Sequence, residues 1–547
     1  MAGLFADYNF SMKIAPLAFA VVLALPVLSG CGGDAPPTPA TPDVPVEPVV
    51  PPVTPPDIPP VTPPVTPPVT PPVTPPVSPP VTPPVTPPGI DYTGDWFVLA
   101  SHCEKPRPGS SYEVQGTLMD ELKWLRSFQD TSYLWYKEIP ANLKLENYNS
   151  AVDYFADLKT PVITASGRPK DRFHFTYPTD AWRALSDAGV ELGYGLTWLR
   201  SISSSARRVW TLTMVAPDSP AALAGLRRGD MLVSVDDVAI IDNSTAGVAA
   251  LNAGLFPVKA GETHRMVLSR DGVLLTATMT SQKVAAPPVQ NVKVFDTTSG
   301  KVGYLQFNEH NAVAEGQLVK AIGSFKTAGV GDLILDMRYN GGGLLDIANE
   351  LAYMIAGPGQ TAGKTFEQLR ANDKTKQDAP SKFLTIARGF RSPDQIPPGT
   401  QLPYLGLKRV TILTTPGTCS ASESVINSLR GIDVEVTLVG GETCGKPYAF
   451  IPAPNCGTTY FSIEYQGVNN KGFGDYADGF PPTCRAGDDL THALGDQAEG
   501  MLAAALSRHA NGACPVAPQS NRMQAGAAPD TMQLVRPPVK EISIRDR

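Results

Sequence analysis

A serine and a lysine stand in two short turns of small residues, and together they could carry out nucleophilic catalysis. The serine is Ser420, and the lysine is Lys446, at the end of a Gly-Gly-Glu-Thr-Cys-Gly-Lys run. A serine that opens a helix exposes its hydroxyl, and backbone N–H groups there can stabilise an oxyanion. Lysine can act as the base only where burial lowers its pKa enough to keep the amine neutral. Alternatively, Ser420 or Ser422 simply caps a helix over Glu423–Arg430.

An earlier glycine-rich turn could supply a second oxyanion donor. The apolar run Leu333–Leu335 is typical of a buried strand, and Leu344–Ala356 has helical periodicity. Between them, Gly341–Gly343 allow the backbone to turn sharply and to approach a ligand closely. Either this turn only joins the strand to the helix, or one of its N–H groups binds an oxyanion.

The order of these motifs resembles that of the carboxyl-terminal processing, or tail-specific, proteases. The shared motifs are Asp-x-Arg-x-Asn-Gly-Gly-Gly at residues 336–343, Ser-Ala-Ser-Glu at residues 420–423 and Gly-Lys at residues 445–446. The resemblance extends over roughly residues 115–510. It implies a serine endopeptidase that works through a Ser/Lys dyad and an acyl-enzyme, without a metal or another cofactor.

The same resemblance assigns roles to individual residues. It implies that Ser420 is the nucleophile and that Lys446 is the general base. The oxyanion hole would combine the backbone N–H of Ala421 with that of Gly342 or Gly343.

The sequence departs from the family pattern beside both catalytic candidates. The family usually has Ser-Ala ahead of Ser-Ala-Ser-Glu, where this chain has Thr418 and Cys419. It usually has a glutamine four places after the lysine, where this chain has Phe450, so the residue that orients Lys446 is open. Candidates for that partner are Glu442, Tyr448 and Gln466. A thiol nucleophile at Cys419 is a weaker alternative, because cysteines of exported proteins usually pair.

The segment from Leu192 to about Val284 resembles a PDZ domain. Ser219–Asp230 has the Ser-Pro-Ala-x-x-Ala-Gly-Leu-x-x-Gly-Asp pattern of PDZ domains in extracytoplasmic proteases. Such domains bind an extended peptide at a sheet edge, which implies protein or peptide substrates recognised through their C-termini. The loop that would hold the terminal carboxylate consists of Gly193, Tyr194, Gly195 and Leu196. The alternative is a hairpin-rich domain without a ligand.

The start of the chain has the features of a bacterial lipoprotein signal. The apolar segment Ala15–Val27 is too short to span a membrane and has the form of a secretory signal. Leu28–Cys31 looks like a lipobox, which implies cleavage before Cys31 and lipidation of its thiol. Cleavage elsewhere is the alternative, and translation could begin at Met1 or Met12. We expect a lipid-anchored periplasmic protein, preferably on the outer membrane.

A proline-rich repeat follows the signal. Val-Thr-Pro-Pro recurs between Ala35 and Gly89, with few large apolar groups, so this segment cannot build a core and should form extended polyproline II. At about 3.1 Å per residue its reach is on the order of 150 Å. It is interpreted as a spacer between anchor and enzyme; a ligand for proline-binding modules is the alternative. The net charge of −7 gives no basis for nucleic-acid binding.

The cysteine count agrees with export. Of the 7 cysteines, six remain if Cys31 is lipidated, and six cysteines allow 15 pairings. Cys444 and Cys456 flank a predicted hairpin and are the first candidates for a pair. No spacing of cysteines or histidines indicates a metal site, and His174 and His310 are expected on the surface or in a polar core.

Alternation of strands and helices implies an α/β layered core, and Leu490–His509 is expected to end that core as a helix. The resemblance specifies a crotonase-like ββα-superhelix with an inserted PDZ-like domain and a helical N-terminal segment. The expected divisions are a signal peptide with a lipobox (1–30), the lipidated cysteine and spacer (31–89), a helical region (90–185), the PDZ-like domain (188–285), the catalytic core (289–514) and a disordered tail (515–547).

Three functions compete at this point. The first is a secreted, membrane-anchored serine endopeptidase with Ser420 and Lys446 as its dyad. The second is a catalytically weak or inactive peptide-binding scaffold, which the missing glutamine favours. The third is a lipoprotein whose core carries an apolar ligand, like the retinoid-binding relatives of this fold.

Overall fold

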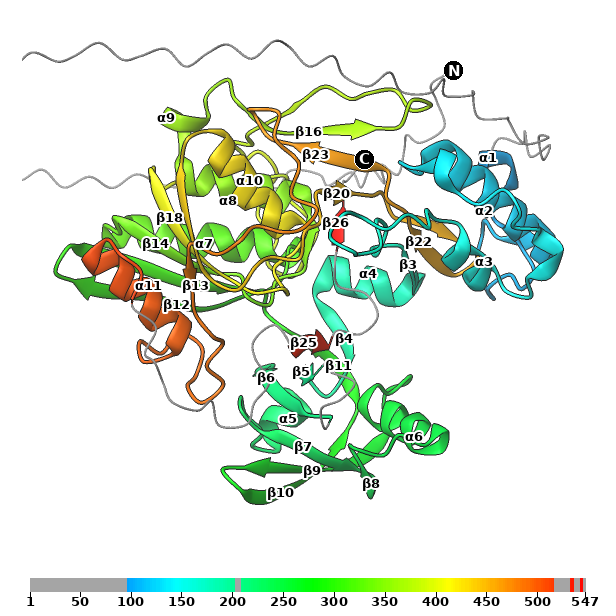
Figure 1. The fold of residues 1–547 in the computed structure, drawn as a ribbon, viewed down its shortest axis with the longest axis horizontal. Coiled ribbons are helices and arrows are strands. Elements are labelled where there is room, and N and C mark those ends of the chain that lie inside the picture. The colour runs from blue at the N-terminus through cyan, green and yellow to red at the C-terminus, as the bar shows by residue number, and fades with distance from the viewer. Residues whose placement is uncertain (1–95, 202–207, 516–531, 536–541, 545–547) are drawn as a thin grey trace, which may run out of the picture. The chain divides into compact units, whose positions relative to one another are not determined.

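The computed structural model describes residues 96–201, 208–515, 532–535 and 542–544 (Figure 1). The chain divides into two compact units, and every described residue belongs to the second, Val85–Arg547. The predicted signal peptide, Cys31 and the proline-rich spacer lie outside the described residues. In the described part of the chain, no helix is both long enough and apolar enough to cross a membrane.

The first folded segment is a small helical layer with short strands. Its longest helix, α2, begins at Thr117, whose side chain accepts the N–H of Asp120 while the Asp120 carboxylate accepts the N–H of Thr117, a reciprocal cap that fixes the helix start. The helices are α1 (Trp96–Leu99), α2 (Leu118–Ser132), α3 (Ala151–Asp157) and α4 (Thr179–Ala188), with 3-10 turns η1 (Tyr136–Glu138) and η2 (Leu145–Asn147). The strands are β1 (His102–Cys103), β2 (Val114–Gln115) and β3 (Phe175–Pro178).

The next segment has a sheet with its own apolar core. Trp198, Leu212, Val235, Met266 and Leu268 are buried together in that core. The sheet order is β10-β9-β7-β6-β5-β25, in which β25 (Met532–Val535) comes from the C-terminal tail. Its elements in chain order are β4 (Val190–Gly193), β5 (Leu196–Ser201), β6 (Trp210–Val215), α5 (Pro220–Leu223), β7 (Met231–Val235), β8 (Val238–Ala239), α6 (Thr245–Leu255), β9 (Thr263–Arg270), β10 (Val273–Thr280) and β11 (Gln282–Ala285). The first and last strands of the segment, β4 and β11, pair antiparallel with each other.

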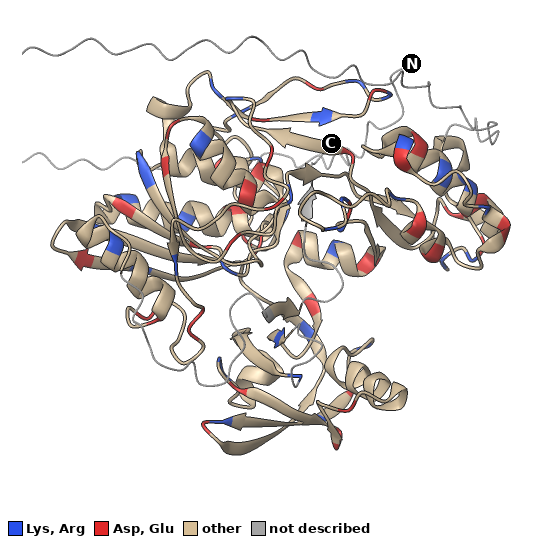
Figure 2. Ribbon diagram, in the orientation of Figure 1, with Lys and Arg blue, Asp and Glu red and all other residues tan. Residues whose placement is uncertain are grey.

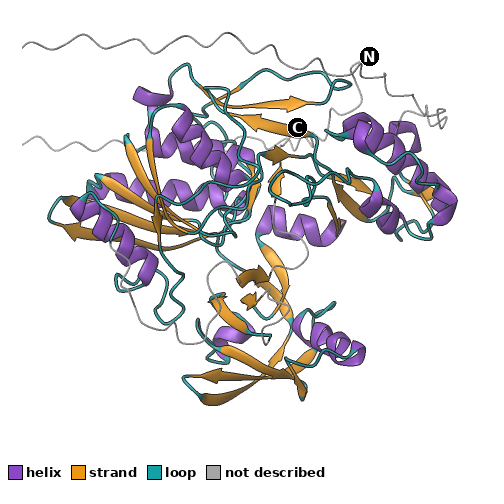
Figure 3. Cartoon of the chain, in the orientation of Figure 1, coloured by secondary structure: helices purple, strands orange, loops and turns teal. Residues whose placement is uncertain are grey.

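The largest segment is built on a six-stranded sheet of order β12-β13-β14-β18-β19-β24, parallel from β13 onward. Its strands are β12 (Val289–Thr297), β13 (Gly300–Phe307), β14 (Asp332–Asp336), β18 (Arg409–Thr414), β19 (Glu435–Gly440) and β24 (Cys484–Arg485). Helices cover both faces (Figure 3): α7 (Ala312–Ala328), α8 (Leu345–Ala356) and α10 (Ala421–Gly431) pack on one, and α11 (Gly500–Asn511) packs on the other. Smaller elements complete it: β15 (Gly342–Leu344), α9 (Pro358–Thr361), β16 (Thr365–Ala371), β17 (Ser381–Lys382), β20 (Tyr448–Ala449), β21 (Ala453–Asn455), β22 (Thr458–Phe461) and β23 (Tyr465–Val468). The predicted mixed α/β class is confirmed.

The sheet residues alternate between its two apolar layers. On β14, Leu333 and Leu335 face the layer with α7, α8 and α10, whereas Ile334 faces the layer with α11. A strand buried on both faces reads as a continuous apolar run, which is why Leu333–Leu335 was recognisable in the sequence. Acidic and basic side chains are interspersed along the described ribbon (Figure 2).

Two local expectations differ from the described residues. A helix predicted from Leu490 to His509 begins at Gly500, because the residues before it form turns that end in Glu499, whose side chain caps the helix by accepting the N–H of Leu502. The tail, predicted to be disordered, contains β25 (Met532–Val535) and β26 (Ile542–Ile544). Both strands pair with edges elsewhere in the chain, and such pairing has no local signature in the sequence.

Candidate active site

Ser420 occupies a strained turn between β18 and α10. Its backbone has φ 62° and ψ −117°, a region that non-glycine residues avoid at a cost of roughly 1–3 kcal/mol. Two hydrogen bonds to the Asn340 carbonyl oxygen hold the turn: the N–H of Cys419 donates at 3.0 Å, and the hydroxyl of Ser422 donates at 3.0 Å. Such a sharp strand-to-helix turn places a serine hydroxyl at a helix N-terminus, where nucleophiles are found in hydrolases.

Lys446 lies in the turn between β19 and β20 and is almost fully buried. Its Nζ lies 4.1 Å from the ring centroid of Phe450 and 5.1 Å from that of Phe173. Phe450 occupies the position at which the family usually has glutamine. The structure therefore places an aromatic ring, rather than an amide, beside the lysine nitrogen. Aromatic faces attract a cation, whereas burial disfavours it.

A buried carboxylate joins the serine turn to the lysine turn. Glu423 Oε2 accepts the N–H of Ser420 at 3.0 Å and the N–H of Lys446 at 2.8 Å. Its Oε1 accepts the N–H of Gly445 at 2.9 Å and the hydroxyl of Thr443 at 2.5 Å. Burial raises the pKa of Glu423 above its ordinary value, although these hydrogen bonds oppose the rise. One side chain thus fixes the main chain at both candidate catalytic residues.

A disulfide ties the same two turns together. Cys419, which precedes Ser420, is bonded to Cys444, with their Cα atoms 5.1 Å apart. A thiol nucleophile at Cys419 is therefore ruled out in this structure. The two sulfurs and the Glu423 carboxylate lie close enough to suggest a metal site, but both sulfurs are used by the disulfide.

The predicted pairing of Cys444 with Cys456 is wrong. The three disulfides are Cys103–Cys456, Cys419–Cys444 and Cys484–Cys514. Hairpin proximity suggested the wrong partner because the approach of the serine turn to the lysine turn is tertiary and leaves no trace in local spacing.

The glycine turn adopts conformations that only glycine tolerates easily. Gly342 has φ 102° and Gly343 has φ 137°, and a Cβ on Gly343 would lie 2.2 Å from the carbonyl oxygen of His310. The N–H of Gly342 donates to the side-chain oxygen of Asn340 at 2.9 Å. Of the two predicted donors, Gly342 is held by a side chain of its own turn, whereas the strand partner of Gly343 is Ser543 of the tail strand β26; this difference favours Gly343 as the partner of Ala421. Ala421 is the first residue of α10.

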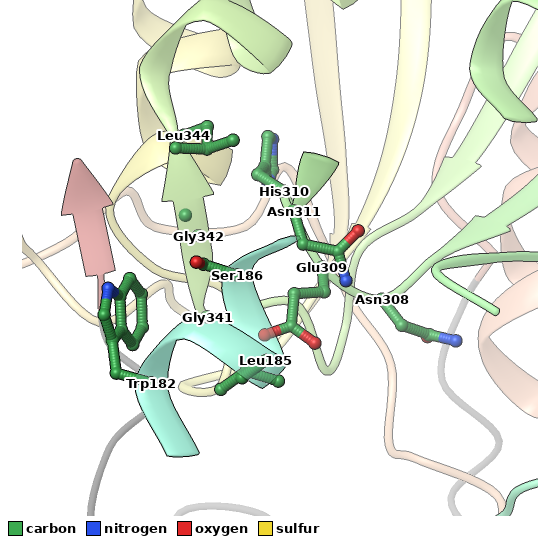
Figure 4. A pocket seen from close by; sticks show the side chains of 11 residues that line it. Trp182, Leu185, Ser186, Asn308, Glu309, His310, Asn311, Gly341, Gly342 and Leu344 are labelled. Atoms are coloured by element: carbon green, nitrogen blue, oxygen red, sulfur yellow. The ribbon is translucent and has the colours of Figure 1, made fainter. Parts of the chain in front are cut away.

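A small pocket lies beside this turn (Figure 4). It is lined by Trp182 and Ser186 from α4, by Glu309 and His310, and by the glycine turn. Nδ1 of His310 lies 3.0 Å from the side-chain oxygen of Asn340. Burial lowers the His310 pKa to about 3, although the hydrogen bond with Asn340 opposes the shift. His310 is thus a neutral polar-core residue that supports the turn.

The three candidates for orienting Lys446 make the following contacts. Glu442 is half-exposed and pairs with Arg168 at 3.9 Å. The amide of Gln466 donates to the carbonyl of Gly474 at 3.1 Å. The ring of Tyr448 packs edge-on against Trp135 with centroids 5.0 Å apart.

Sequence reasoning missed Arg172. Its guanidinium donates to the carbonyl oxygens of Cys444 at 2.8 Å, Gly445 at 3.1 Å and Ala477 at 3.0 Å, so it holds the lysine turn against a neighbouring loop. Arg172 lies outside every recognised motif, and the sequence carries no signal for it. Glu423 belongs to the Ser-Ala-Ser-Glu motif but was interpreted only as a helix residue.

The predicted peptide-binding loop joins β4 to β5. Gly193 and Gly195 have φ 153° and 78°, and a Cβ on Gly195 would lie 2.4 Å from the Cβ of Ser219. The Tyr194 side chain is buried, and its carbonyl accepts the N–H of Ala221. The loop ends at Leu196, where β5 begins, and β5 lies next to the outermost strand of its sheet.

Comparison with known proteins is consistent with this architecture. Residues 301–452 match the model of peptidase family S41, and residues 212–254 match that of the PDZ domain. The chain carries a family S41 peptidase segment and a PDZ domain. It is 28% identical over 337 residues to a C-terminal processing peptidase, chloroplastic, of Tetradesmus obliquus, which covers 59% of this chain and 66% of that protein. It is 25% identical over 319 residues to a carboxyl-terminal-processing protease of Synechocystis, which covers 57% and 64%.

A solved structure supports the fold over most of the described residues. A putative S41 protease from Bacteroides fragilis matches with a TM-score of 0.54 and 25% identity, covering 74% of this chain and 99% of that one. The chain spans less than two thirds of the length of the curated relatives reported above. The homology therefore shows the family segments and the fold.

Proposed function

We propose that the protein is a serine endopeptidase that cuts protein substrates through a Ser420/Lys446 dyad. The observation that carries the proposal is the Glu423 carboxylate, which accepts the backbone N–H groups of both Ser420 and Lys446 on one oxygen. A helix-capping role would explain the contact of Glu423 with Ser420. It would not explain why the same carboxylate also holds the turn that carries the buried Lys446. The disulfide between Cys419 and Cys444 adds a covalent link at the same place.

The proposed reaction follows the acyl-enzyme route. The Ser420 hydroxyl oxygen adds to the substrate carbonyl carbon, and its proton passes to the neutral amine of Lys446. The N–H groups of Ala421 and Gly343 stabilise the oxyanion that forms. Lys446 then gives the proton to the departing amine as the peptide bond breaks. In the second half of the reaction, Lys446 takes a proton from the water that adds to the acyl carbonyl carbon, and it returns that proton to the Ser420 oxygen as the ester bond breaks.

Substrate recognition is assigned to the PDZ domain. The loop Gly193–Leu196 leads directly into β5, and PDZ domains bind extended peptides by strand addition beside such a loop. We propose that substrates dock there through their C-terminal segments, so that the peptide end selects which proteins reach the dyad.

A catalytically weak or inactive scaffold is the second candidate function. Phe450 favours it, because an aromatic ring stands where the family usually has a glutamine that orients the lysine. The two functions differ in whether Ser420 becomes acylated.

Hydrolysis of unfolded casein tests the proposal directly. We expect activity in the wild type and none in Ser420→Ala or Lys446→Ala, because nucleophile and base act as a unit. The exposed residues Ser381 and Lys408 provide matched controls, and Ser381→Ala and Lys408→Ala should retain full activity. A fluorophosphonate probe should label the wild type but not Ser420→Ala. Absence of both hydrolysis and labelling in the wild type would establish the scaffold instead.

We also propose that the enzyme is exported and anchored by lipid at Cys31, with the proline-rich segment as a spacer. The lipobox-like run Leu28–Cys31 and the apolar segment before it support this proposal. Cys31→Ser should move the protein from the membrane to the soluble periplasmic fraction with its activity intact. A Cys31→Ser protein that still sediments with membranes and resists salt extraction would refute the anchor.

A further inference from the structure

The C-terminal tail supplies a strand to the PDZ sheet. β25 pairs antiparallel with β5, and the register joins Met532 to Ser201 and Val535 to Trp198. The pairing therefore runs along the strand that follows the Gly193–Leu196 loop, and the later end of β25 points toward that loop. An exposed strand edge with unpaired backbone groups is a ready template for another strand.

Side chains of β25 contact the same domain. Val535 packs against its apolar core, and the side-chain oxygen of Gln533 accepts a hydrogen bond from Arg200 at 2.9 Å. An apolar residue placed on the core beside an aligned backbone is the mode by which PDZ domains hold extended peptides. The tail thus uses the proposed substrate-docking edge.

A second tail strand lies at the candidate catalytic centre. β26 pairs in parallel with β15, with Ile542 opposite Gly342, Ser543 opposite Gly343 and Ile544 opposite Leu344. It also contacts β20, which follows Lys446, and α10, which begins beside Ser420. The backbone of β26 therefore pairs with the strand that carries the proposed oxyanion donor Gly343, and it contacts the elements that follow Ser420 and Lys446 in the chain.

The two tail strands are close in the chain. Six residues separate Val535 from Ile542, a span that extended backbone bridges over roughly 25 Å at most. Both strands therefore belong to one short stretch of the sequence, and the chain continues beyond Val535 before β26 begins.

We propose that the two C-terminal strands, β25 (Met532–Val535) and β26 (Ile542–Ile544), occupy the substrate path of their own molecule and compete with incoming substrates. The proposal rests on the proposed function for its consequence, since inhibition requires an activity to inhibit. A tethered segment competes at an effective concentration in the millimolar range when its linker is short and spans the sites. Free substrates must therefore displace it, first from β5 and then from β15.

The test uses the full chain, two Val→Asp substitutions at different places and one Ser→Pro substitution. Val535→Asp places a charge against the PDZ core and should release β25, whereas Val273→Asp makes the same change at an exposed position on β10, the opposite edge of the same sheet. Ser543→Pro removes a backbone N–H from β26 and should release the catalytic end alone. Hydrogen–deuterium exchange is followed over Leu196–Ser201 and Gly342–Leu344 in the Ser420→Ala background, where no self-digestion can occur.

We expect Val535→Asp to speed exchange over β5, Ser543→Pro to speed exchange over β15, and Val273→Asp to do neither. In the active chain, Val535→Asp and Ser543→Pro should lower KM for an unrelated fluorogenic peptide several-fold at similar kcat. Unchanged exchange in both tail variants would overturn the proposal even if the enzyme is active. Faster exchange without hydrolysis in any variant would leave the tail placement intact and refute the protease function instead. Protection of β5 that rises with protein concentration would assign the strand to a second copy and overturn binding in cis.

Discussion

Glu423 stabilises the candidate site through backbone groups rather than through a charged partner. Its two oxygens accept three N–H groups, from Ser420, Gly445 and Lys446, and one hydroxyl, from Thr443. Hydrogen bonds to a buried charged group contribute more than those between neutral groups. Because the donors belong to the main chain, the Glu423 carboxylate fixes the backbone positions of Ser420 and Lys446. Glu423 therefore acts as a positioning residue.

Glu423→Gln should lower kcat at least tenfold with little change in KM. The amide offers one acceptor oxygen in place of two and presents an NH₂ to backbone donors, a loss on the order of 3 kcal/mol. Steady-state kinetics on a fluorogenic peptide and the rate of fluorophosphonate labelling should fall together. Glu442→Gln is the control, because Glu442 is half-exposed and its carboxylate lies 3.9 Å from the Arg168 guanidinium. A variant that loses thermal stability but keeps its labelling rate would show a structural role alone.

Glu367 predicts a pH dependence of stability. Burial raises its pKa to about 7, although the hydroxyl of Ser424 on α10 donates to it at 3.0 Å and opposes the rise. Because the folded pKa exceeds the ordinary value of 4.5, the folded state binds more protons than the unfolded state between these values. Stability attributable to Glu367 therefore falls as pH rises from about 4.5 to about 7, by roughly 3 kcal/mol at most.

Glu367→Gln should remove this contribution to the pH dependence. The free energy of unfolding of the variant, relative to that of the wild type, should therefore be higher at pH 8 than at pH 5. Urea unfolding of the wild type and the variant at both values measures the difference. Glu435→Gln, an exposed glutamate on β19, should follow the wild type at both. A wild type and a Glu367→Gln variant with parallel pH profiles would contradict the assignment.

At the scale of elements, the disulfide Cys419–Cys444 and the disulfide Cys484–Cys514 form a natural pair for comparison. They close loops of similar length, with sequence separations of 25 and 30. Each should stabilise the fold by about 3 kcal/mol through the unfolded chain. Only the first joins the turn before α10 to the turn after β19, and so only the first bears on the relation of Ser420 to Lys446.

Replacing both cysteines of either pair with alanine separates the two effects. We expect both double variants to lose thermal stability to a similar extent. Cys419→Ala/Cys444→Ala should also lose kcat several-fold at a temperature where it remains folded, whereas Cys484→Ala/Cys514→Ala should keep it. Calorimetry and initial rates measure the two quantities. Equal kcat in both double variants would show that Glu423, without the disulfide, is sufficient to hold the serine turn and the lysine turn in place.

Local periodicity accounts for the elements that the sequence predicted well. The strand that includes Leu333–Leu335 and the helix that includes Leu344–Ala356 agree with β14 and α8 to within about two residues. Each is an apolar run or face long enough to be recognised alone. The motif residues Ser420 and Lys446 were found because their turns have unusual composition, and the structure brings those turns together.

Features that depend on distant contacts were not predictable. The disulfide partners follow from how the serine and lysine turns approach each other. Arg172 reaches the lysine turn from a segment far earlier in the chain. β25 and β26 are short segments that become strands only because β5 and β15 offer them an edge.

At the scale of the whole described chain, one arginine connects the PDZ domain to the catalytic core. Arg228 follows α5, and its guanidinium donates to the Tyr339 hydroxyl at 2.6 Å and to Asp488 at 2.5 Å. Arg338 donates to Asp488 at 2.9 Å and to Glu499 at 2.7 Å. Arg338 and Tyr339 are separated from the glycine turn Gly341–Gly343 by Asn340 alone. This network therefore ties the PDZ domain to the segment that carries the proposed oxyanion donor.

The charge balance at Asp488 sets the sign of its contribution to stability. Burial would raise its pKa, but Arg228 and Arg338 outweigh burial and lower it below the ordinary value of 3.8. The carboxylate therefore contributes stability that is present above pH 3.8 and is lost as pH falls through the lower folded value. At neutral pH its charge is balanced by two arginines, and removal of one leaves the buried carboxylate poorly compensated.

Arg228→Met should destabilise the protein at neutral pH by roughly 3 kcal/mol, the cost of breaking a buried pair from one side. Arg227→Met is the control, because Arg227 is its exposed neighbour and engages Asp230 through its backbone N–H. Adding Asp488→Asn to Arg228→Met should recover part of the loss, since the uncompensated charge is then gone. Urea unfolding at pH 7 compares the three variants with the wild type. If Arg228→Met and Arg227→Met instead unfold at the same urea concentration, Arg228 joins the two domains without stabilising them. The PDZ domain would then be held by β4, β11 and its other contacts.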